Sequence, residues 1–283
     1  MTEILCPVCG KMLSNADGSV KCENGHSFDI SRKGYVNLLP PSGSGHHGDD
    51  KLMVKARTRF LSAGYYDELS DEICSLILKY MPDGGTVIDA GCGEGKYICD
   101  IRKALLSEAR SAELVGFDIS KDAINALASR SRDIRAYVAS TSDMPVPDGS
   151  ADVLLNIFSP FFSREFQRVI KPGGVLVRVI PDTEHLWELK EKIYDTPYKN
   201  PPAETDIEGF AVEEIREVKY TITLPDRESV NDLFMMTPYY YKTGRNDQEK
   251  LQKIDSLTVS LEFVIGVYRP NGKMGGNGKC MMN

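Results

Sequence analysis

The sequence lacks any apolar run near the ~18 residues that a membrane-spanning helix requires. Its first residues, Met1 to Cys6, lack the basic stretch and apolar core of a secretory signal, so we expect no such signal. Basic residues are not in excess either, because 34 Lys and Arg stand against 41 Asp and Glu, a formal net charge of −7. These absences exclude a membrane-spanning chain. Taken over the whole sequence, they also argue against a nucleic-acid partner.

The charge and the cysteines are unevenly distributed. Residues 1–60 hold eight Lys and Arg and six Asp and Glu, a net +2, which leaves 26 basic and 35 acidic residues, a net −9, for the remainder. Of the seven cysteines, Cys6, Cys9 and Cys22 lie close together and the other four are scattered. An odd count without a signal favours reduced thiols in the cytoplasm over a disulfide scaffold. The 283 residues correspond to about two domains.

The clustered cysteines form part of a zinc-binding pattern. Cys6 and Cys9 are followed after twelve residues by Cys22 and then His26, which gives C-x2-C-x12-C-x3-H. Zinc prefers four tetrahedral thiolate or imidazole ligands, and two short-spaced pairs on separate turns supply them. Four ligands leave no open position, so we expect a structural zinc. The alternative is four unrelated residues whose cysteines are free thiols in a small core.

A short apolar segment and a linker follow this knuckle. Residues 27–30 and 34–40 read as one or two strands that pack on the knuckle, and the Gly/Ser-rich segment 41–48 reads as a flexible linker. His46 and His47 lie in that linker, where we expect solvated side chains rather than metal ligands. We therefore expect three parts: a zinc-binding module with its linker over 1–45, a larger domain over 46–270 and a flexible tail over 271–283. Such a knuckle often binds nucleic acid or a protein partner, which makes an RNA-recognition role for the first part a hypothesis, and a purely structural role is the alternative.

The larger domain contains a glycine-rich turn typical of a nucleoside cofactor site. Val87 and Ile88 read as a buried strand, Asp89 ends it, and Gly91, Gly93 and Gly95 follow at alternate positions before a helix near residue 96. Dinucleotide sites use G-x-G-x-x-G to hold a pyrophosphate, whereas an acid followed by G-x-G-x-G is typical of S-adenosylmethionine sites. The alternative is that these glycines serve turn geometry alone.

Further strands extend the same pattern. Residues 114–118 form a strand that ends in Asp118, placed to accept both ribose hydroxyls, and Ser120 is expected to cap the next helix. The strand over 134–139 leads to Asp143, which suits an adenine amino group, and the strand over 151–156 ends in Asn156. From the general logic of the fold, we count Asp118, Asp143 and Asn156 among the cofactor-binding candidates. Strands alternating with helices predict an α/β fold with a doubly wound, mostly parallel sheet, a Rossmann-like class I methyltransferase domain.

The chemistry beyond the fifth strand is less defined. Residues 182–189 read as a helix capped by Asp182 or Thr183, and residues 195–212 read as a loop or lid. Asp182 is a candidate general base, and a helix cap is the alternative interpretation. Aromatic residues that suit base stacking have core packing as their alternative: Phe158, Phe161, Phe162 and Tyr239 to Tyr241. Basic residues that suit RNA phosphates are Lys11, Lys21, Arg32, Lys33, Lys51, Lys55, Arg57 and Arg59.

The chain as a whole resembles the RlmA-type guanine-N1 methyltransferases of large-subunit ribosomal RNA, from Cys6 to about Arg269. The resemblance rests on the knuckle, on the segments K-G-Y-V-N-L-L-P (33–40), R-F-L-S-A-G-Y-Y (59–66), G-C-G-E-G (91–95), F-D-I-S (117–120), H-L-W-E-L-K (185–190) and M-T-P (236–238). The knuckle joined to residues 33–40 is the specific part, since the glycine motif fits any class I methyltransferase.

The resemblance implies both a function and a set of site residues. It implies methyl transfer from S-adenosylmethionine to N1 of a guanine in a large-subunit rRNA hairpin, by a cytoplasmic homodimer whose zinc modules help form an RNA-binding cleft. It places zinc on the four knuckle residues and cofactor contacts on Tyr66, Gly93, Glu94 and His185. Ser159-Pro160-Phe161-Phe162 departs from the small residue, Pro and Cys that the family commonly shows there.

Two other functions remain open at this point. A small-molecule methyltransferase with a structural zinc knuckle would share the same fold and cofactor site, and the acidic total suits it better. A zinc-binding interaction module fused to a degenerate Rossmann domain is the second alternative. The intact acidic and glycine positions, from Asp89 to Asp118, argue against degeneracy.

Overall fold

The computed structural model describes residues 2–39, 48–244 and 249–271. Nearly all of the linker predicted over 41–48, with His46 and His47, and of the tail predicted over 271–283 lies outside these residues. The strands are β1 (Ser14–Ala16), β2 (Ser19–Lys21), β3 (Ser27–Asp29), β4 (Val36–Asn37), β5 (Gly85–Ala90), β6 (Ala112–Asp118), β7 (Arg135–Val138), β8 (Ala151–Ile157), β9 (Ile170–Pro181), β10 (Phe210–Leu224) and β11 (Leu257–Pro270). The helices are α1 (Lys51–Ser62), α2 (Asp67–Tyr80), α3 (Lys96–Ser107), α4 (Lys121–Arg130), α5 (Ser163–Val169), α6 (Trp187–Ile193), α7 (Arg227–Met235) and α8 (Tyr239–Lys242).

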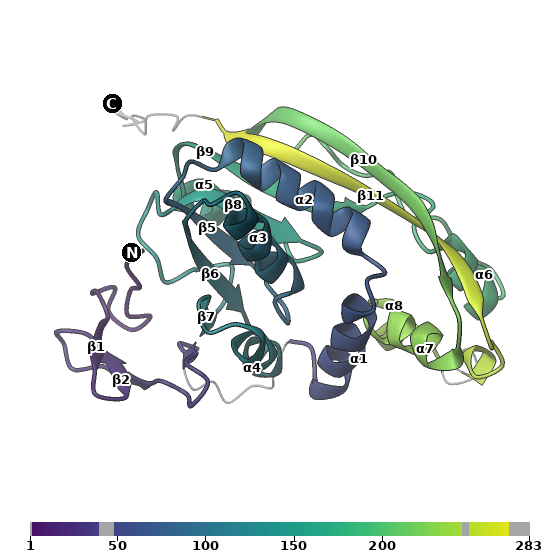
Figure 1. Ribbon diagram of the computed structural model, residues 1–283, viewed down its shortest axis with the longest axis horizontal. Helices are drawn as coiled ribbons and strands as arrows, with labels where there is room; N and C mark the ends of the chain where they lie inside the picture. The colour runs from purple at the N-terminus through teal and green to yellow at the C-terminus, as the bar shows by residue number, and fades with distance from the viewer. Residues whose placement is uncertain (1, 40–47, 245–248, 272–283) are drawn as a thin grey trace, which may run out of the picture.

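An eight-stranded sheet of order β10-β11-β9-β8-β5-β6-β7-β4 organises the molecule (Figure 1). The six strands from β9 to β4 run parallel, and β11 and β10 add to the β9 edge in antiparallel orientation. From β5 the chain proceeds through β6 to β7 on one side, and β8 then returns to the other side of β5. This arrangement confirms the doubly wound, mostly parallel sheet, and it places the reversal of strand order beside β5, where such sheets bind ligands.

The central strands are apolar because helices cover them. All six residues of β5 are buried, as is the run from Val153 to Ile157 in β8. In α2 the apolar residues recur at helical spacing, and Leu69, Ile73, Leu76 and Ile77 are all fully buried on one face. No helix within the described residues is long and apolar enough to cross a membrane.

The N-terminal segment is fastened to the main sheet by its own strand. β1, β2 and β3 form a small antiparallel sheet, but β4 pairs in parallel with β7 at the edge of the large one. The expectation that residues 34–40 pack on the knuckle was therefore incomplete. The edge of β7 offers unpaired backbone groups, and Val36 and Leu38 bury their side chains in the core there. The zinc-binding segment is consequently held beside β7 (Figure 1).

The C-terminal part is a long hairpin of β10 and β11 that curves along the sheet, with α6, α7 and α8 near its far end (Figure 1). The predicted helix over 182–189 begins later, at Trp187, after Leu186 in a left-handed conformation (φ 58°). Capping by Asp182 or Thr183 was therefore wrong. β11 holds the preceding turn instead, because Asp182 N–H donates to Glu262 O (2.9 Å) and Leu186 N–H to Ser260 O (2.9 Å).

Candidate functional site

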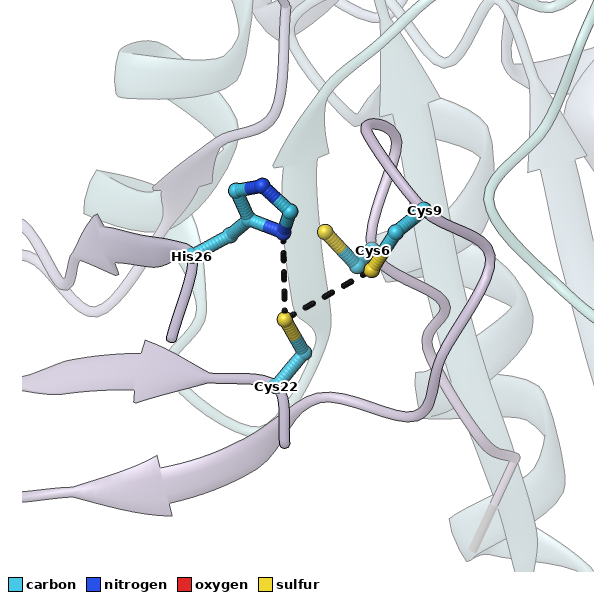
Figure 2. Close-up of side chains that lie close together, drawn as sticks. All are labelled: Cys6, Cys9, Cys22 and His26. Atoms are coloured by element: carbon cyan, nitrogen blue, oxygen red, sulfur yellow. Dashed lines mark hydrogen bonds between the residues drawn. The ribbon is translucent and has the colours of Figure 1, made fainter. Parts of the chain in front are cut away.

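The knuckle brings its four predicted zinc ligands together (Figure 2). The first pair lies on a turn that the Gly10 N–H closes on Cys6 O, and the second on a turn that the Gly25 N–H closes on Cys22 O. The ligand atoms of Cys6, Cys9, Cys22 and His26 all lie within 4.8 Å of one another. The six described cysteines form no disulfide.

The spacing of these atoms fits a tetrahedral zinc ion. Sγ of Cys9 lies 3.7 Å from Sγ of Cys22, which in turn lies 3.3 Å from Nδ1 of His26. Two sulfurs bonded to one ion at ~2.3 Å, at a tetrahedral angle, would be about 3.8 Å apart. A hydrogen bond from the Lys11 N–H is the main cause that lowers the pKa of Cys9 to about 6, which favours the thiolate that a metal binds. The donor set therefore fits a structural zinc.

A second site is built at the carboxyl end of β5. Gly91 and Cys92 N–H both donate to Phe117 O on β6, so the glycine turn is fixed across two strands. Gly91 has φ 92°, and a Cβ there would lie 2.5 Å from Cβ of Ser159. Gly95 precedes α3 with φ 85°, and a Cβ there would lie 2.3 Å from the side chain of Leu127. These two positions accept only glycine, which explains the motif in physical terms.

Asp118 is positioned by backbone donors at the end of β6. Its Oδ2 accepts from Gly93 N–H (2.9 Å) and its Oδ1 from Ser120 N–H (2.7 Å). Burial raises its pKa above the ordinary value, and these two hydrogen bonds oppose that rise. Ser120 caps α4 as expected, with its hydroxyl accepting from Ala123 N–H (3.2 Å). The carboxylate is thus fixed beside the glycine turn, in the place expected for a ribose-binding acid.

Buried polar atoms without protein partners surround this turn. Oδ1 of Asp89, Oε1 of Glu94 and the hydroxyl of Tyr97 accept or donate no hydrogen bond within the described part of the chain, while Oε2 of Glu94 forms an ion pair with Nε of Arg130 (2.9 Å). Burial, and then the charges of Asp118 and Glu94, raise the pKa of Asp89 to about 8. Leaving such groups unpaired is costly. A ligand that brings positive charge and hydroxyl groups would relieve that cost, and S-adenosylmethionine has both.

His185 and Tyr66 lie around Phe263 of β11. The Phe263 ring centroid lies 4.7 Å from that of His185, 5.2 Å from that of Tyr66 and 5.5 Å from that of Phe158. Nδ1 of His185 accepts from Glu262 N–H (3.3 Å), so a neutral ring carries its proton on Nε2. Burial, assisted by the charge of Lys190, lowers the pKa of His185 to about 3. His185 is therefore a neutral donor over the working pH range.

Three other predicted residues have different surroundings. Asp143 is exposed on the loop after β7, which begins beside Asp118 because Ala139 N–H donates to Asp118 O (3.0 Å). Asn156 is buried and directs Nδ2 to Ser159 Oγ (2.6 Å) and Pro160 O (3.1 Å). Asn156 thus positions Ser159 against the glycine turn. Its own direct cofactor contact, like that of Asp143, stays a prediction.

Asp182 lies at the end of β9 and organises a loop. Burial favours the neutral carboxyl, but the N–H groups of Thr183 and Ala203 and the charge of Lys219 outweigh it and hold the pKa of Asp182 below its usual value. Lys219 Nζ lies 3.6 Å from its Oδ2. A general-base role for Asp182 stays a prediction that these contacts do not favour, because a low pKa weakens a base.

Two site residues escaped the sequence reading. Ser159 donates to Ala90 O (2.7 Å) and fills the space over Gly91, whereas the sequence indicated it only as part of a segment that departs from the family pattern. Arg57 was assigned to RNA phosphates, yet its Nη1 would lie 3.7 Å from a Cβ at Gly93. Its position two residues before the 59–66 segment was the available signal. Tertiary packing of α1 decides its neighbourhood.

Comparison with known proteins agrees with both halves of this architecture. Residues 4–42 match the family model described as "RlmA, N-terminal", and residues 82–224 match one described as "Methyltransferase domain". A Bacillus subtilis (strain 168) protein with the provisional name 23S rRNA (guanine-N(1)-)-methyltransferase YxjB is 32% identical over 277 residues, 93% of this chain and 96% of that protein.

Two actinobacterial proteins are similar over about two thirds of their length. The 23S rRNA (guanine(748)-N(1))-methyltransferase of Streptomyces fradiae is 35% identical over 192 residues, 66% of each chain. A protein of Micromonospora griseorubida with a provisional 23S rRNA (guanine-N(1)-)-methyltransferase name is 36% identical over 212 residues, 68% of this chain and 70% of that protein. Together, the two matched family models cover the zinc-ligand segment and the glycine turn within one chain.

Proposed function

This chain belongs to the family of RlmA-type 23S rRNA (guanine-N1)-methyltransferases, and on that premise we propose that it transfers a methyl group from S-adenosylmethionine to N1 of a guanine in large-subunit rRNA. The observation that carries the proposal is the joining of a four-ligand zinc knuckle to a class I glycine turn surrounded by buried acids. Neither feature alone would distinguish this family from other methyltransferases.

Different side chains would bind different parts of the cofactor. S-adenosylmethionine, when bound, supplies an electrophilic methyl group on a sulfonium. Asp118 would accept the ribose hydroxyls, while Asp89 and Glu94 would face positive charge, because all three lie at the glycine turn with lone pairs unused. Tyr66 and His185 would close the opposite side through the Phe263 cluster. Positioning of the methyl group against the acceptor nitrogen would supply most of the rate gain.

Phe158 is the aromatic residue best placed to stack on an extruded guanine. Phe161 and Phe162 both pack on Phe166, which supports core packing for them. Phe158 instead follows β8 with a left-handed backbone (φ 52°) and leaves 44% of its surface exposed. A large residue in that conformation is strained, and such strain is concentrated at functional positions. Phe158→Ala should lose RNA methylation while S-adenosylmethionine affinity changes little, and Phe161→Ala is the matched core control.

RNA binding would use the seam between the zinc-binding segment and α4. A cavity of about 270 Å³ lies there, and its charged lining residues are Arg32, Lys33 and Arg132. Cations without a neighbouring carboxylate in the lining suit phosphates of the RNA backbone. Arg132→Gln should weaken binding of an rRNA hairpin and reduce the slope of affinity against salt by about one, with S-adenosylmethionine affinity unchanged. An unchanged slope would contradict this role.

We extend the proposal to the setting of the enzyme. The family resemblance supports an rRNA hairpin as substrate, a homodimer whose zinc modules line the RNA cleft, and a cytoplasmic location. It also supports treating residues 1–45 as the RNA-recognition module and residues 46–270 as the catalytic domain. Light scattering of the purified protein, alone and with an rRNA hairpin, measures the dimer directly. A monomer in both samples would refute that part.

The central experiment maps the modified base. Ribosomal RNA lacking the modification is incubated with labelled S-adenosylmethionine and enzyme, and reverse-transcriptase stops are mapped, since N1 methylation blocks base pairing. We expect one enzyme-dependent stop at a guanine of the large-subunit RNA. Label that enters small molecules and not RNA would support the small-molecule methyltransferase instead. In the same assay, Asp182→Asn with full turnover and an unchanged pH profile would rule out Asp182 as the base.

A further inference from the structure

Arg57 reaches from α1 into the cofactor site. Its Nη1 is the atom nearest to a Cβ built on Gly93, at 3.7 Å, and the side chain is 22% exposed. Nη1 also pairs with the carboxylate of Asp49, and Nη2 lies 3.4 Å from Met236 O. The guanidinium is therefore held over the glycine turn from two sides. The contacts to Asp49 and Met236 leave other N–H groups of the guanidinium available to a ligand.

The ionisable groups at this turn are mostly acidic. Asp89, Glu94 and Asp118 lie around the turn, and Asp49 lies just outside it. Burial is the main influence on the pKa values of Glu94 and Asp118 and raises both. The charge of Arg57 opposes this rise in both groups, so the guanidinium lies within electrostatic reach of both carboxylates.

Two other cations lie near Glu94, and each of them has its own protein partners. Nε of Arg130 lies 2.9 Å from Glu94 Oε2, and Nη2 of the same residue lies 3.4 Å from Ser62 Oγ. Lys96 pairs with Asp67 (2.7 Å) and with Asp100. Arg57 differs from both because it lies directly over the backbone of the turn.

S-adenosylmethionine carries two cations, the sulfonium and the ammonium, and one anion, the α-carboxylate. The acids of the site suit its cations and its ribose hydroxyls, but the carboxylate needs a donor within the same site. We propose that Arg57 binds the α-carboxylate of S-adenosylmethionine. This inference rests on the cofactor assignment in the proposed function, and it assigns Arg57 to the cofactor rather than to RNA.

Asp49 is a positioning residue in this arrangement. Its backbone oxygen accepts from Ser120 Oγ (2.6 Å), the hydroxyl that caps α4 next to Asp118. Its side chain pairs with Arg57, and the following residue, Asp50, caps α1 through Leu52 N–H (2.8 Å) and Met53 N–H (3.0 Å). Asp49 thus holds the guanidinium of Arg57, and Asp50 fixes the start of the helix that carries Arg57.

The test compares ligands with and without the carboxylate. Binding of S-adenosylmethionine, S-adenosylhomocysteine and 5′-methylthioadenosine, which lacks the amino-acid portion, is measured by calorimetry on the full-length protein without RNA. Arg57→Gln should weaken the first two ligands roughly 10- to 100-fold, the range for a charge-assisted hydrogen bond, and methylthioadenosine less than about threefold. Arg57→Lys should recover part of the loss. Lys55→Gln, an exposed residue of the same helix, is the matched control and should change none of them.

Each outcome decides the inference. An equal loss for all three ligands, or no loss for any, would overturn it, and so would weaker hairpin binding by Arg57→Gln with unchanged S-adenosylmethionine affinity. Unfolding curves of each variant show whether a loss comes from misfolding, in which case Arg57→Lys gives the comparison. Guanine methylation by the wild-type enzyme is measured in parallel. Methylation of guanine can be absent while ligand binding changes as described, so failure of the proposed function is distinguishable from failure of the Arg57 proposal.

Discussion

Asp89→Asn should stabilise the ligand-free protein and destroy its function. The carboxylate is 1% exposed at the end of β5, Oδ1 lacks a hydrogen-bond partner within residues that the structure describes, and burial raises its pKa to about 8. Folding therefore forces a group that prefers to be ionised in water to stay protonated. Asn has nearly the same shape and no charge, so it removes this cost.

The magnitude follows from proton linkage. In the unfolded chain the pKa of Asp is ~3.9, so between pH 4 and 8 the folded protein binds a proton that the unfolded chain has lost. Because the folded-state pKa is raised, stability falls as pH rises through this window, by roughly 1.4 kcal/mol per pH unit. At pH 7 the accumulated cost is about 4 kcal/mol, and we expect Asp89→Asn to recover about 2–4 kcal/mol of it. Near pH 4 the two proteins should be equally stable.

The assay is denaturant unfolding of the wild type and Asp89→Asn without S-adenosylmethionine at pH 4.5, 6, 7 and 8. The difference in unfolding free energy should grow with pH and level off above about 8, the folded pKa. Cofactor binding by the variant should be at least about tenfold weaker, since the ammonium loses its carboxylate partner. A difference that is independent of pH, or a variant that is less stable at every pH, would refute the reasoning.

Three further predictions concern separate parts of the chain. Cys22→Ser should release zinc, detected with a chromophoric chelator, while S-adenosylmethionine affinity changes less than about threefold; zinc retained at full occupancy would contradict the ligand set. Gly91→Ala should lower the unfolding free energy by roughly 2–4 kcal/mol, because φ is 92° and the new Cβ would meet Ser159; Gly93→Ala, whose new Cβ would lie at ordinary contact distance (3.7 Å) from Arg57 Nη1, is the comparison and should cost less. Lys190→Met should lower the unfolding free energy by about 1–3 kcal/mol and speed amide exchange over residues 182–186, because Lys190 Nζ donates to Asn200 Oδ1 (2.6 Å). Unchanged amide exchange over 182–186 would contradict a role of Lys190 in holding the turn before α6.

Local patterns predicted the parts of this protein that are built from neighbouring residues. The zinc ligands form two turns of four and five residues, so their spacing alone predicted their meeting. The glycine turn is similar, because left-handed backbone at Gly91 and Gly95 demands glycine whatever surrounds it. Buried strands and amphipathic helices of the methyltransferase sheet were predictable from periodicity for the same reason.

Contacts between distant segments were not predictable in this way. The addition of β4 to the edge of β7 joins residues about 100 positions apart, and nothing in residues 34–40 named that partner. The late start of α6 came from hydrogen bonds to β11, some 75 residues away, which outweighed the capping signals of Asp182 and Thr183. Separating exposed Phe158 from packed Phe161 and Phe162 likewise required the core around Phe166.

The sequence by itself thus determined the zinc-ligand set, the acidic glycine turn, the doubly wound sheet and the family resemblance, because each depends on residues close together in the chain. Only the tertiary structure decided that Arg57 lies over the glycine turn, that Asn156 positions Ser159, and that Asp89 and Glu94 are buried with carboxylate oxygens that accept no hydrogen bond from the described residues. These properties depend on burial and on charges brought together from different elements. Burial and long-range electrostatics arise only when the chain has folded.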